Sequence, residues 1–248
     1  SNRELEQFAF MASHDLQEPL RKIEMFGDLL MDRAVSLQAH ERNYVERMRN
    51  AASRMRDMIE GLLQISRVAT QGRPFVRANL SKIVAEVLTD YESQIQRSGA
   101  SVKVDALPTV MGDPLQLRQL LQNLIGNALK YHQPGRLPEL RVTGKRFDDR
   151  VQIQVQDQGI GFDQEDADRI FEPFQRLVGR NQYEGSGIGL AICRRIVERH
   201  GGEIAAISER GIGTTFIITL PVQPRKGVKS KSRKDNNDED SAFTPDRG

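Results

Sequence analysis

The sequence of 248 residues has one cysteine, Cys193, and no tryptophan. One cysteine excludes an internal disulfide and any zinc site built on several thiolates, and it is typical of a reducing compartment. There is no apolar run near the roughly 20 residues of a membrane span, and no signal peptide with a basic start and an apolar middle. We therefore expect the chain to be soluble and cytoplasmic.

Charge of neither sign is in excess, since 36 basic residues stand against 34 acidic ones and the net charge is +2. This balance indicates no particular partner, and we predict no nucleic-acid binding. Residues 223–248 differ from the rest, because a basic run is followed there by an acidic run with almost nothing apolar. That composition predicts a disordered, solvated tail rather than a binding site.

Glycine and proline are scarce between residues 5 and 68, which are rich in Leu, Met, Glu, Arg and Ala. This stretch predicts two long helices in a hairpin. Apolar residues of the second helix follow the heptad pattern of a bundle seam: Tyr44, Met48, Ala51, Met55, Met58, Leu62 and Ile65. A similar seam in the first helix shifts its phase near its middle: Leu5, Phe8, Ala12, Leu16, Pro19, Ile23, Phe26 and Leu30. One hairpin cannot bury two apolar stripes, so we predict a homodimer that forms a four-helix bundle.

The length of the chain fits two domains, which we place at residues 1–70 and 81–222 with a linker at 71–80. Within the second domain the residue patterns predict helices at 80–95, 114–131 and 187–200 and strands at 101–104, 140–146, 150–156 and 213–220. This order predicts an α+β sandwich, in which helices cover one face of a mixed sheet.

Four motifs carry chemistry, and the first is centred on His14 in the first helix. At about 100° per residue, His14 lies roughly 200° from Ala12 and Leu16, so we expect it to point away from the seam. A neutral imidazole has a lone pair that can attack phosphorus, and the adjacent Asp15 carboxylate can hold the proton on the other ring nitrogen. His14 and Asp15 are therefore candidate catalytic residues. The other histidines are predicted to be inert surface residues: His40, His132 and His200.

The second motif lies in the predicted helix at 114–131 and ends at Tyr131. Asn123 and Asn127 are one helical turn apart, so both amide oxygens can approach a magnesium ion that also holds phosphates. Lys130 follows about one turn later and adds a positive charge for phosphate. These residues are candidate ligands of a phosphorylated cofactor and its metal.

The third motif, Asp157-Gln-Gly159-Ile-Gly161, directly follows a predicted strand. The carboxylate can accept a hydrogen bond from the exocyclic amine of an adenine base. The two glycines allow the backbone to come close to such a ligand. The motif therefore predicts the base-binding end of a nucleotide site.

The fourth motif is a glycine-rich loop that opens the predicted helix at 187–200, with Gly185, Gly187, Gly189 and Leu190. Free amides and the positive end of the helix suit phosphate groups. A dinucleotide fingerprint is excluded, because no strand-turn-helix unit with an acidic residue about 20 positions on accompanies it.

In this order the motifs resemble the catalytic core of the sensor histidine kinase family over about residues 5–221, in the variant of phytochrome-like and sensor-linked kinases. Residues 171–176 are similar to the phenylalanine box of that family, which anchors a mobile lid, here at about residues 175–186. The resemblance implies a Bergerat-type (GHKL) ATP-binding fold, ATP and Mg²⁺ as cofactors, and Asn123 and Asn127 as metal ligands. It further implies phosphoryl transfer from ATP to His14 and onward to an aspartate of a response-regulator receiver domain. We expect any sensor domain to lie upstream, outside this chain.

Two other functions compete with this one. In ATP-driven conformational clamps of the gyrase or Hsp90 kind, a glutamate four residues before the metal-binding asparagine activates water. Asn123 holds that place here, and an amide cannot act as a base. A pseudokinase that only dimerises is disfavoured because all four motifs are intact. Family members with phosphatase activity carry Thr or Asn four residues after the histidine, where this chain has Glu18, so we expect a kinase-dominated output.

Overall fold

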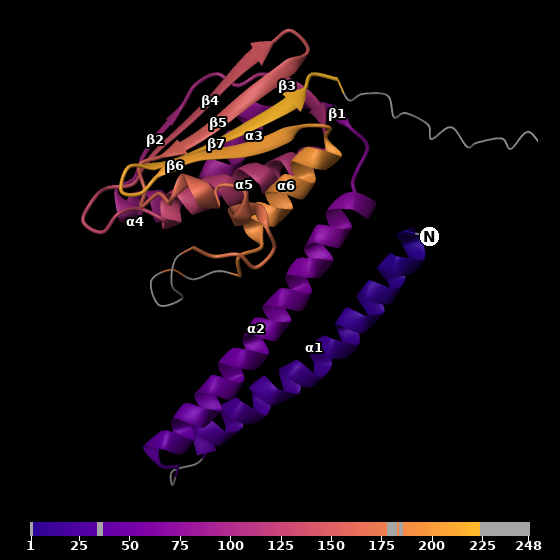
Figure 1. The fold of residues 1–248 in the computed structure, drawn as a ribbon, viewed down its shortest axis with the longest axis vertical. Coiled ribbons are helices and arrows are strands. Elements are labelled where there is room, and N and C mark those ends of the chain that lie inside the picture. The colour runs from indigo at the N-terminus through magenta and orange to yellow at the C-terminus, as the bar shows by residue number, and fades with distance from the viewer. Residues whose placement is uncertain (1, 34–36, 178–182, 184–185, 224–248) are drawn as a thin grey trace, which may run out of the picture.

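The computed structural model describes residues 2–33, 37–177, 183 and 186–223, with side chains from Leu16 onward except at Arg33 and Ala69. Two long helices, α1 (Asn2–Arg33) and α2 (Ala39–Thr70), run antiparallel as a hairpin that projects from an α+β domain (Figure 1). The predicted fold class, a helical hairpin followed by an α+β sandwich, is confirmed. Among the described residues, no helix has both the length and the apolarity needed to cross a membrane.

Among the side chains that the structure describes, the two helices of the hairpin pack through a narrow apolar seam and two ion pairs. Leu20, Val45 and Ala52 are buried between them. Asp28 pairs with Arg49 at 2.6 Å and Glu24 pairs with Arg56. These pairs show that the two helices run antiparallel, because the earlier residue of α1 pairs with the later residue of α2.

A broad apolar stripe remains on the outside of the hairpin in the single chain. It contains residues of the predicted seam that are 40–58% exposed: Leu16, Ile23, Phe26, Leu30, Tyr44, Met48, Met55, Met58 and Leu62. Ile65 differs from them, because it packs against the core of the α+β domain. The last turns of α2 therefore belong partly to the second domain.

The α+β domain is built on a five-stranded sheet. Its strand order is β2 (Ser101–Val104), β4 (Glu139–Phe147), β5 (Arg150–Asp157), β7 (Gly213–Pro221), β6 (Glu203–Glu209). β2 and β4 are parallel, and the other neighbours are antiparallel. A separate antiparallel pair joins β1 (Val76–Asn79) to β3 (Thr109–Gly112).

The helices of the domain lie on one face of the larger sheet (Figure 1). They are α3 (Leu80–Asp90), α4 (Glu92–Ser98), α5 (Pro114–Lys130) and α6 (Gly189–Arg199), with short 3₁₀ turns at Gln164–Asp166 and Arg169–Phe171. The core forms where this layer meets β5, whose Val151, Ile153 and Val155 are fully buried, as the period of two along a strand requires. α5 begins sharply because Asp113 caps it and proline occupies its first turn.

The structure differs from the sequence prediction in two ways. The single helix predicted at 80–95 is wrong, since the chain breaks into α3 and α4 at Tyr91. The tertiary cause is the Tyr91 hydroxyl, which lies over Gly126 of α5 and donates to the Gln122 carbonyl at 3.3 Å. Three strands were not predicted, β1, β3 and β6. Two of these are only four residues long, which is too short for a period of two to stand out in the sequence.

Candidate active site

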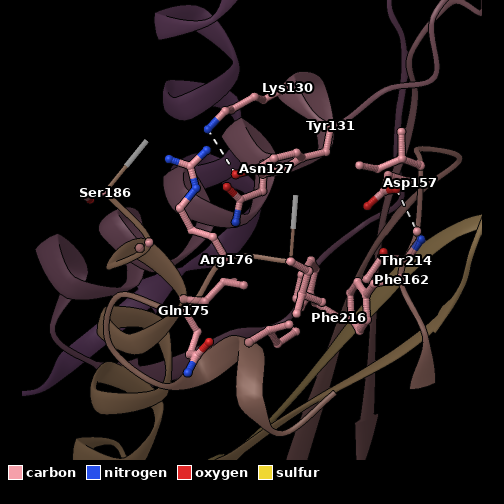
Figure 2. Close-up of a pocket in the computed structure, with 17 residues that line it drawn as sticks. Asn127, Lys130, Tyr131, Asp157, Phe162, Gln175, Arg176, Ser186, Thr214 and Phe216 are labelled. Atoms are coloured by element: carbon pink, nitrogen blue, oxygen red, sulfur yellow. Dashed lines mark hydrogen bonds between the residues drawn. The ribbon is translucent and has the colours of Figure 1, made fainter. Parts of the chain in front are cut away.

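A cavity of about 230 Å³ lies between α5, α6 and the ends of β5 and β7 (Figure 2). It brings together most of the residues that the motifs singled out: Asn127, Lys130, Tyr131, Asp157, Gly161, Gly187, Gly189 and Leu190. The motifs are up to 63 residues apart in the sequence, from Asn127 to Leu190, and they meet because α5 and α6 pack side by side. Gly185 lies outside the described residues.

Asp157 closes one end of the cavity at the last residue of β5. Its Oδ1 accepts hydrogen bonds from the backbone N–H groups of Gly159, at 2.8 Å, and Thr214, at 3.2 Å. Figure 2 shows the bond from Thr214. Burial raises the pKa of Asp157 to about 6, while these two hydrogen bonds act to lower it. The carboxylate is thus held in one orientation in a poorly hydrated place, as a site that recognises a hydrogen-bond donor requires.

The glycines after Asp157 pack against protein backbone. A β-carbon on Gly159 would lie 2.3 Å from the Tyr131 carbonyl oxygen, and one on Gly161 would lie 2.0 Å from the Glu209 carbonyl oxygen. Gly161 also has a φ of +57°. Gly159 is therefore needed for the close approach of this loop to the end of α5, and it does not line the cavity.

α5 contributes a polar wall near the opposite end. Asn127 and Lys130 line the cavity, and Lys130 Nζ lies 3.1 Å from the Tyr131 hydroxyl. Asn123, one turn earlier, does not line it. Its amide donates to the Gly189 carbonyl at 3.2 Å, so it ties α5 to the first residue of α6.

The glycine loop leads into the start of α6. Gly187 has a φ of +75°, and its carbonyl accepts a hydrogen bond from the Phe174 backbone at 3.0 Å. No described side chain caps α6, which begins at Gly189, so the backbone N–H groups of its first turn can bind an anion. The Phe174 backbone thereby ties the segment before the lid to the glycine loop, and the role of the phenylalanine box as a hydrophobic anchor of the lid stays a prediction.

Several cavity residues were not among the predicted site residues. They are Ile160, Phe162, Ile170, Gln175, Arg176, Leu177, Ser186, Thr214 and Phe216. Phe162, Ile170 and Phe216 give the cavity an apolar side next to Asp157, which suits a flat ring. The strand pattern of β7 marks Thr214 and Phe216 as inward-facing residues, but nothing local indicates that they meet a cavity.

Part of the predicted lid at residues 175–186 is described. The Tyr183 hydroxyl donates to the His132 carbonyl at 3.0 Å, and its ring centroid lies 5.0 Å from that of Tyr131. Residues 178–182 and 184–185 lie outside the described part of the chain, so the movement of the lid stays a prediction.

The first motif is placed only by its backbone. His14 and Asp15 belong to α1, and their side chains lie outside the part of the chain that the structure describes. The prediction that His14 points away from the seam therefore stays a prediction. The prediction that His200 is an inert surface residue is wrong, because it is only 2% exposed at the end of α6.

Comparisons with known proteins cover both parts of the chain. Residues 4–71 match the model of the His Kinase A (phospho-acceptor) domain, and residues 112–224 match that of the histidine kinase-, DNA gyrase B- and HSP90-like ATPases. Cyanobacterial phytochrome A of Nostoc sp. is 40% identical over 96% of this chain, and phytochrome-like protein Cph1 of Synechocystis sp. is 37% identical over 90%. The chain covers 31% and 30% of these two proteins, so it spans about a third of the length of each.

Solved structures agree with this result. The crystal structure of full-length ShkA in complex with AMPPNP matches 87% of this chain with a TM-score of 0.62 at 26% identity, and 45% of the ShkA chain is covered. Histidine kinase ThkA in complex with response regulator protein TrrA shares the fold, with a TM-score of 0.61 at 23% identity over 92% of this chain and 66% of that one. The chain therefore belongs to the sensor histidine kinase family, of which it holds the catalytic core, a phosphoacceptor hairpin followed by an ATP-binding domain.

Proposed function

We propose that this chain transfers the γ-phosphoryl group of ATP to His14 and then passes it to an aspartate of a response-regulator receiver domain. The observation that carries the proposal is the position of the cavity, whose glycine loop lies against the helical hairpin. A β-carbon on Gly61 of α2 would lie only 1.9 Å from the Ile188 side chain, between Gly187 and Gly189. The nucleotide site and the phosphoacceptor hairpin thus share a contact.

In the proposed complex the adenine ring binds at the apolar end of the cavity. Asp157 accepts a hydrogen bond from the exocyclic amine, and Phe162 and Phe216 pack beside the ring. The phosphates extend toward Lys130 and the first turn of α6, where positive charge and free N–H groups stabilise them. Gly187 of the glycine loop and the first residues of α6, Gly189 and Leu190, surround these phosphates, and we propose the same role for Gly185 from its place in the motif.

Magnesium fits the polar end of this site. Amide oxygens are hard ligands of the kind that Mg²⁺ uses together with phosphate oxygens, and Asn127 presents its amide to the cavity. Asn123 lies outside the cavity lining and uses its amide nitrogen for the Gly189 carbonyl, so it would reach the metal only through its amide oxygen. The metal, when bound, neutralises charge on the phosphates.

The transfer at His14 is a displacement at phosphorus. A lone pair of the neutral imidazole forms the new N–P bond, the bond from phosphorus to the bridging oxygen breaks, and ADP leaves with that electron pair. Asp15 holds the proton of the other ring nitrogen and stabilises the imidazolium that develops. The phosphohistidine then donates to a receiver carboxylate, which regenerates the neutral ring.

We further propose the division into a dimerising hairpin (1–70), a linker (71–80), an ATP-binding domain (81–222) and a solvated tail (223–248). A homodimer buries the exposed stripe on α1 and α2 in a four-helix bundle. Glu18, which pairs with Lys22 at 2.8 Å, occupies the place where relatives with phosphatase activity position water, so kinase output dominates. The reaction belongs to a reducing, cytoplasmic setting, and a sensor domain outside this chain supplies the signal.

The test is incubation of the protein with γ-labelled ATP, compared with His14→Gln. We expect acid-labile label on the wild type and none on the variant. His40→Gln is the matched control, since His40 lies at the far end of the hairpin, and it should label like the wild type. Label that survives in His14→Gln contradicts the acceptor assignment, whereas ATP hydrolysis without any protein label favours the conformational clamp.

A further inference from the structure

The short segment between α2 and β1, residues 71–75, crosses the ends of two helices of the ATP-binding domain. We call this segment the strap. The Arg73 backbone N–H donates to Asp113 Oδ2 at 2.6 Å, and the Arg73 carbonyl accepts from Arg199 at 3.0 Å. The strap is therefore bound on both sides, by the residue that caps α5 and by the last residue of α6.

The Arg199 side chain binds both the strap and the start of α5. Its Nη1 lies 2.7 Å from the Gln116 side-chain oxygen and 3.4 Å from Asp113 Oδ2. Asp113 is 2% exposed and Arg199 is 20% exposed, so the charges interact in a poorly hydrated place. A β-carbon on Gly72 would lie 2.0 Å from the guanidinium carbon, which shows that the side chain passes directly over the strap.

An aromatic residue fixes the end of the strap in the same cluster. The Phe75 ring stacks on the buried His200 ring, with centroids 4.5 Å apart, and the Arg199 guanidinium lies 4.8 Å from the centroid of Phe75. His200 in turn accepts a hydrogen bond from the Asp113 backbone N–H at 3.0 Å. Each polar group of the cluster thus contacts either the strap or a residue that binds it.

The cluster also holds the last turn of α2. Gln116, whose oxygen contacts Arg199, donates through its amide nitrogen to the Val68 carbonyl at 2.9 Å. Val68 is 4% exposed and belongs to the hydrophobic core of the ATP-binding domain. Because α2 is a continuous helix, fixing its last turn also fixes the position of Gly61 along the helix axis relative to the ATP-binding domain. Ile188 of the glycine loop contacts α2 at this glycine.

The position of Gly61 along the hairpin matters because the register of the two helices relates it to His14. Asp28 pairs with Arg49 and Glu24 pairs with Arg56. Continued toward the start of α1, this register brings the backbone of His14 to within about one helical turn of the level of Gly61. Figure 1 shows the N-terminal part of α1 at the same end of the hairpin as the ATP-binding domain.

We infer that Arg199 is a positioning residue for phosphoryl transfer: through Asp113, Gln116 and the strap it pins the ATP-binding domain to the end of α2, at the level of His14. The inference rests on the proposed function. Arg199 does not line the cavity, so it acts on the distance between nucleotide and acceptor and leaves nucleotide binding unchanged. A chain without this pin keeps both reacting groups but holds them together for less of the time.

The experiment uses the full chain and compares Arg199→Gln with the wild type. We expect the kcat of His14 phosphorylation to fall at least about fivefold, while the affinity for ATP stays within about twofold. Amide hydrogen exchange in residues 71–78 should become about tenfold faster, because the Arg73 hydrogen bond no longer has a fixed acceptor. A merely structural role of Arg199 would leave kcat unchanged.

Two further variants keep the test valid if Arg199→Gln folds poorly. Gly72→Ala retains Arg199 but displaces its guanidinium, so it should lower kcat and strap protection in the same way. Arg195→Gln is the matched control, because Arg195 lies one turn earlier on α6 and pairs with Glu198 on the surface. It should behave like the wild type.

Each outcome decides the inference. Faster exchange in the strap with an unchanged or higher kcat overturns the positioning role, and unchanged exchange in both variants overturns the pin itself. A wild-type protein that takes no label on His14 overturns the proposed function and the positioning role together. A labelled wild type with unaltered Arg199→Gln overturns only the inference.

Discussion

Gly61 of α2 and Ile188 of the glycine loop are in direct contact, so closely that a β-carbon on Gly61 would lie 1.9 Å from Ile188 Cδ1. Ile188 is 4% exposed and immediately precedes α6, whose first turn lines the cavity. A glycine inside a long helix lowers its stability relative to alanine. Its presence here is explained by the need to admit Ile188, and this leads to the first prediction.

Gly61→Ala should push the glycine loop away from α2 and lower the rate of His14 phosphorylation several-fold. ATP affinity should fall less than the rate, because Asp157, Asn127 and Lys130 keep their places in the cavity and only the glycine loop moves. The double variant Gly61→Ala with Ile188→Ala should recover part of the rate, since the second change removes the clash. Initial rates with labelled ATP measure both, and an additive loss in the double variant would contradict the contact.

Asp157→Asn should weaken ATP binding about tenfold or more. In this variant an amide nitrogen, itself a donor, faces the exocyclic amine of adenine, whose hydrogen bond the carboxylate accepts in the wild type. The same variant should stabilise the nucleotide-free protein above pH 6. The folded-state pKa of about 6 exceeds the ordinary value of 3.8, so the cost of burying the charge is complete above pH 6 and disappears as the pH falls toward 3.8. Calorimetric titration and thermal melting at pH 7.5 and 4.5 test the two halves of this prediction.

His200 should make the protein less stable in mild acid. Burial lowers the pKa of His200, so the unfolded chain binds more protons than the folded one as the pH falls below about 6.5. Its contribution is complete above that pH and is lost as the pH falls toward the folded-state pKa. The variant His200→Gln should lose less stability than the wild type between pH 7.5 and 5.5 in urea unfolding. Asp157 acts in the opposite direction, but equally in both proteins, so the difference reports on His200.

Gly161→Ala should destabilise the ATP-binding domain by about 1–3 kcal/mol, because it combines a positive φ with a clash against the Glu209 carbonyl. Gly211→Ala is the matched control. Gly211 also has a positive φ, of +78°, but a β-carbon there meets nothing within 4 Å. Thermal melting should show the larger loss for Gly161→Ala, and equal losses would mean that the clash is relieved by a small backbone shift.

Met55→Glu should break the proposed homodimer, since Met55 is 44% exposed in the centre of the apolar stripe and a buried carboxylate there is costly. Light scattering after size exclusion should report a dimer for the wild type and a monomer for the variant at micromolar concentration. Arg54→Glu changes the charge of the neighbouring exposed residue and should leave the dimer intact. A dimeric Met55→Glu variant would place the interface elsewhere.

Periodicity was sufficient to predict the elements that are long and regular. The heptads of residues 44–65 predicted α2 and its exposed stripe, because a helix places every third and fourth residue on one face whatever surrounds it. The same local geometry placed Asn127 and Lys130 on one side of α5. Where tertiary contact overrides local preference, as at Tyr91, the prediction of a continuous helix was wrong.

Local patterns were enough to predict a helical hairpin, an α+β domain and the motifs of the nucleotide site, since these depend on spacing within one helix or one loop. Three other features arise only from packing: Asn123 binds the Gly189 carbonyl, Thr214 holds Asp157, and His200 is buried. Packing also brings Arg199 to Asp113, which is 86 residues away in the sequence. Such contacts depend on how whole elements pack, and no local pattern of residues carries that information.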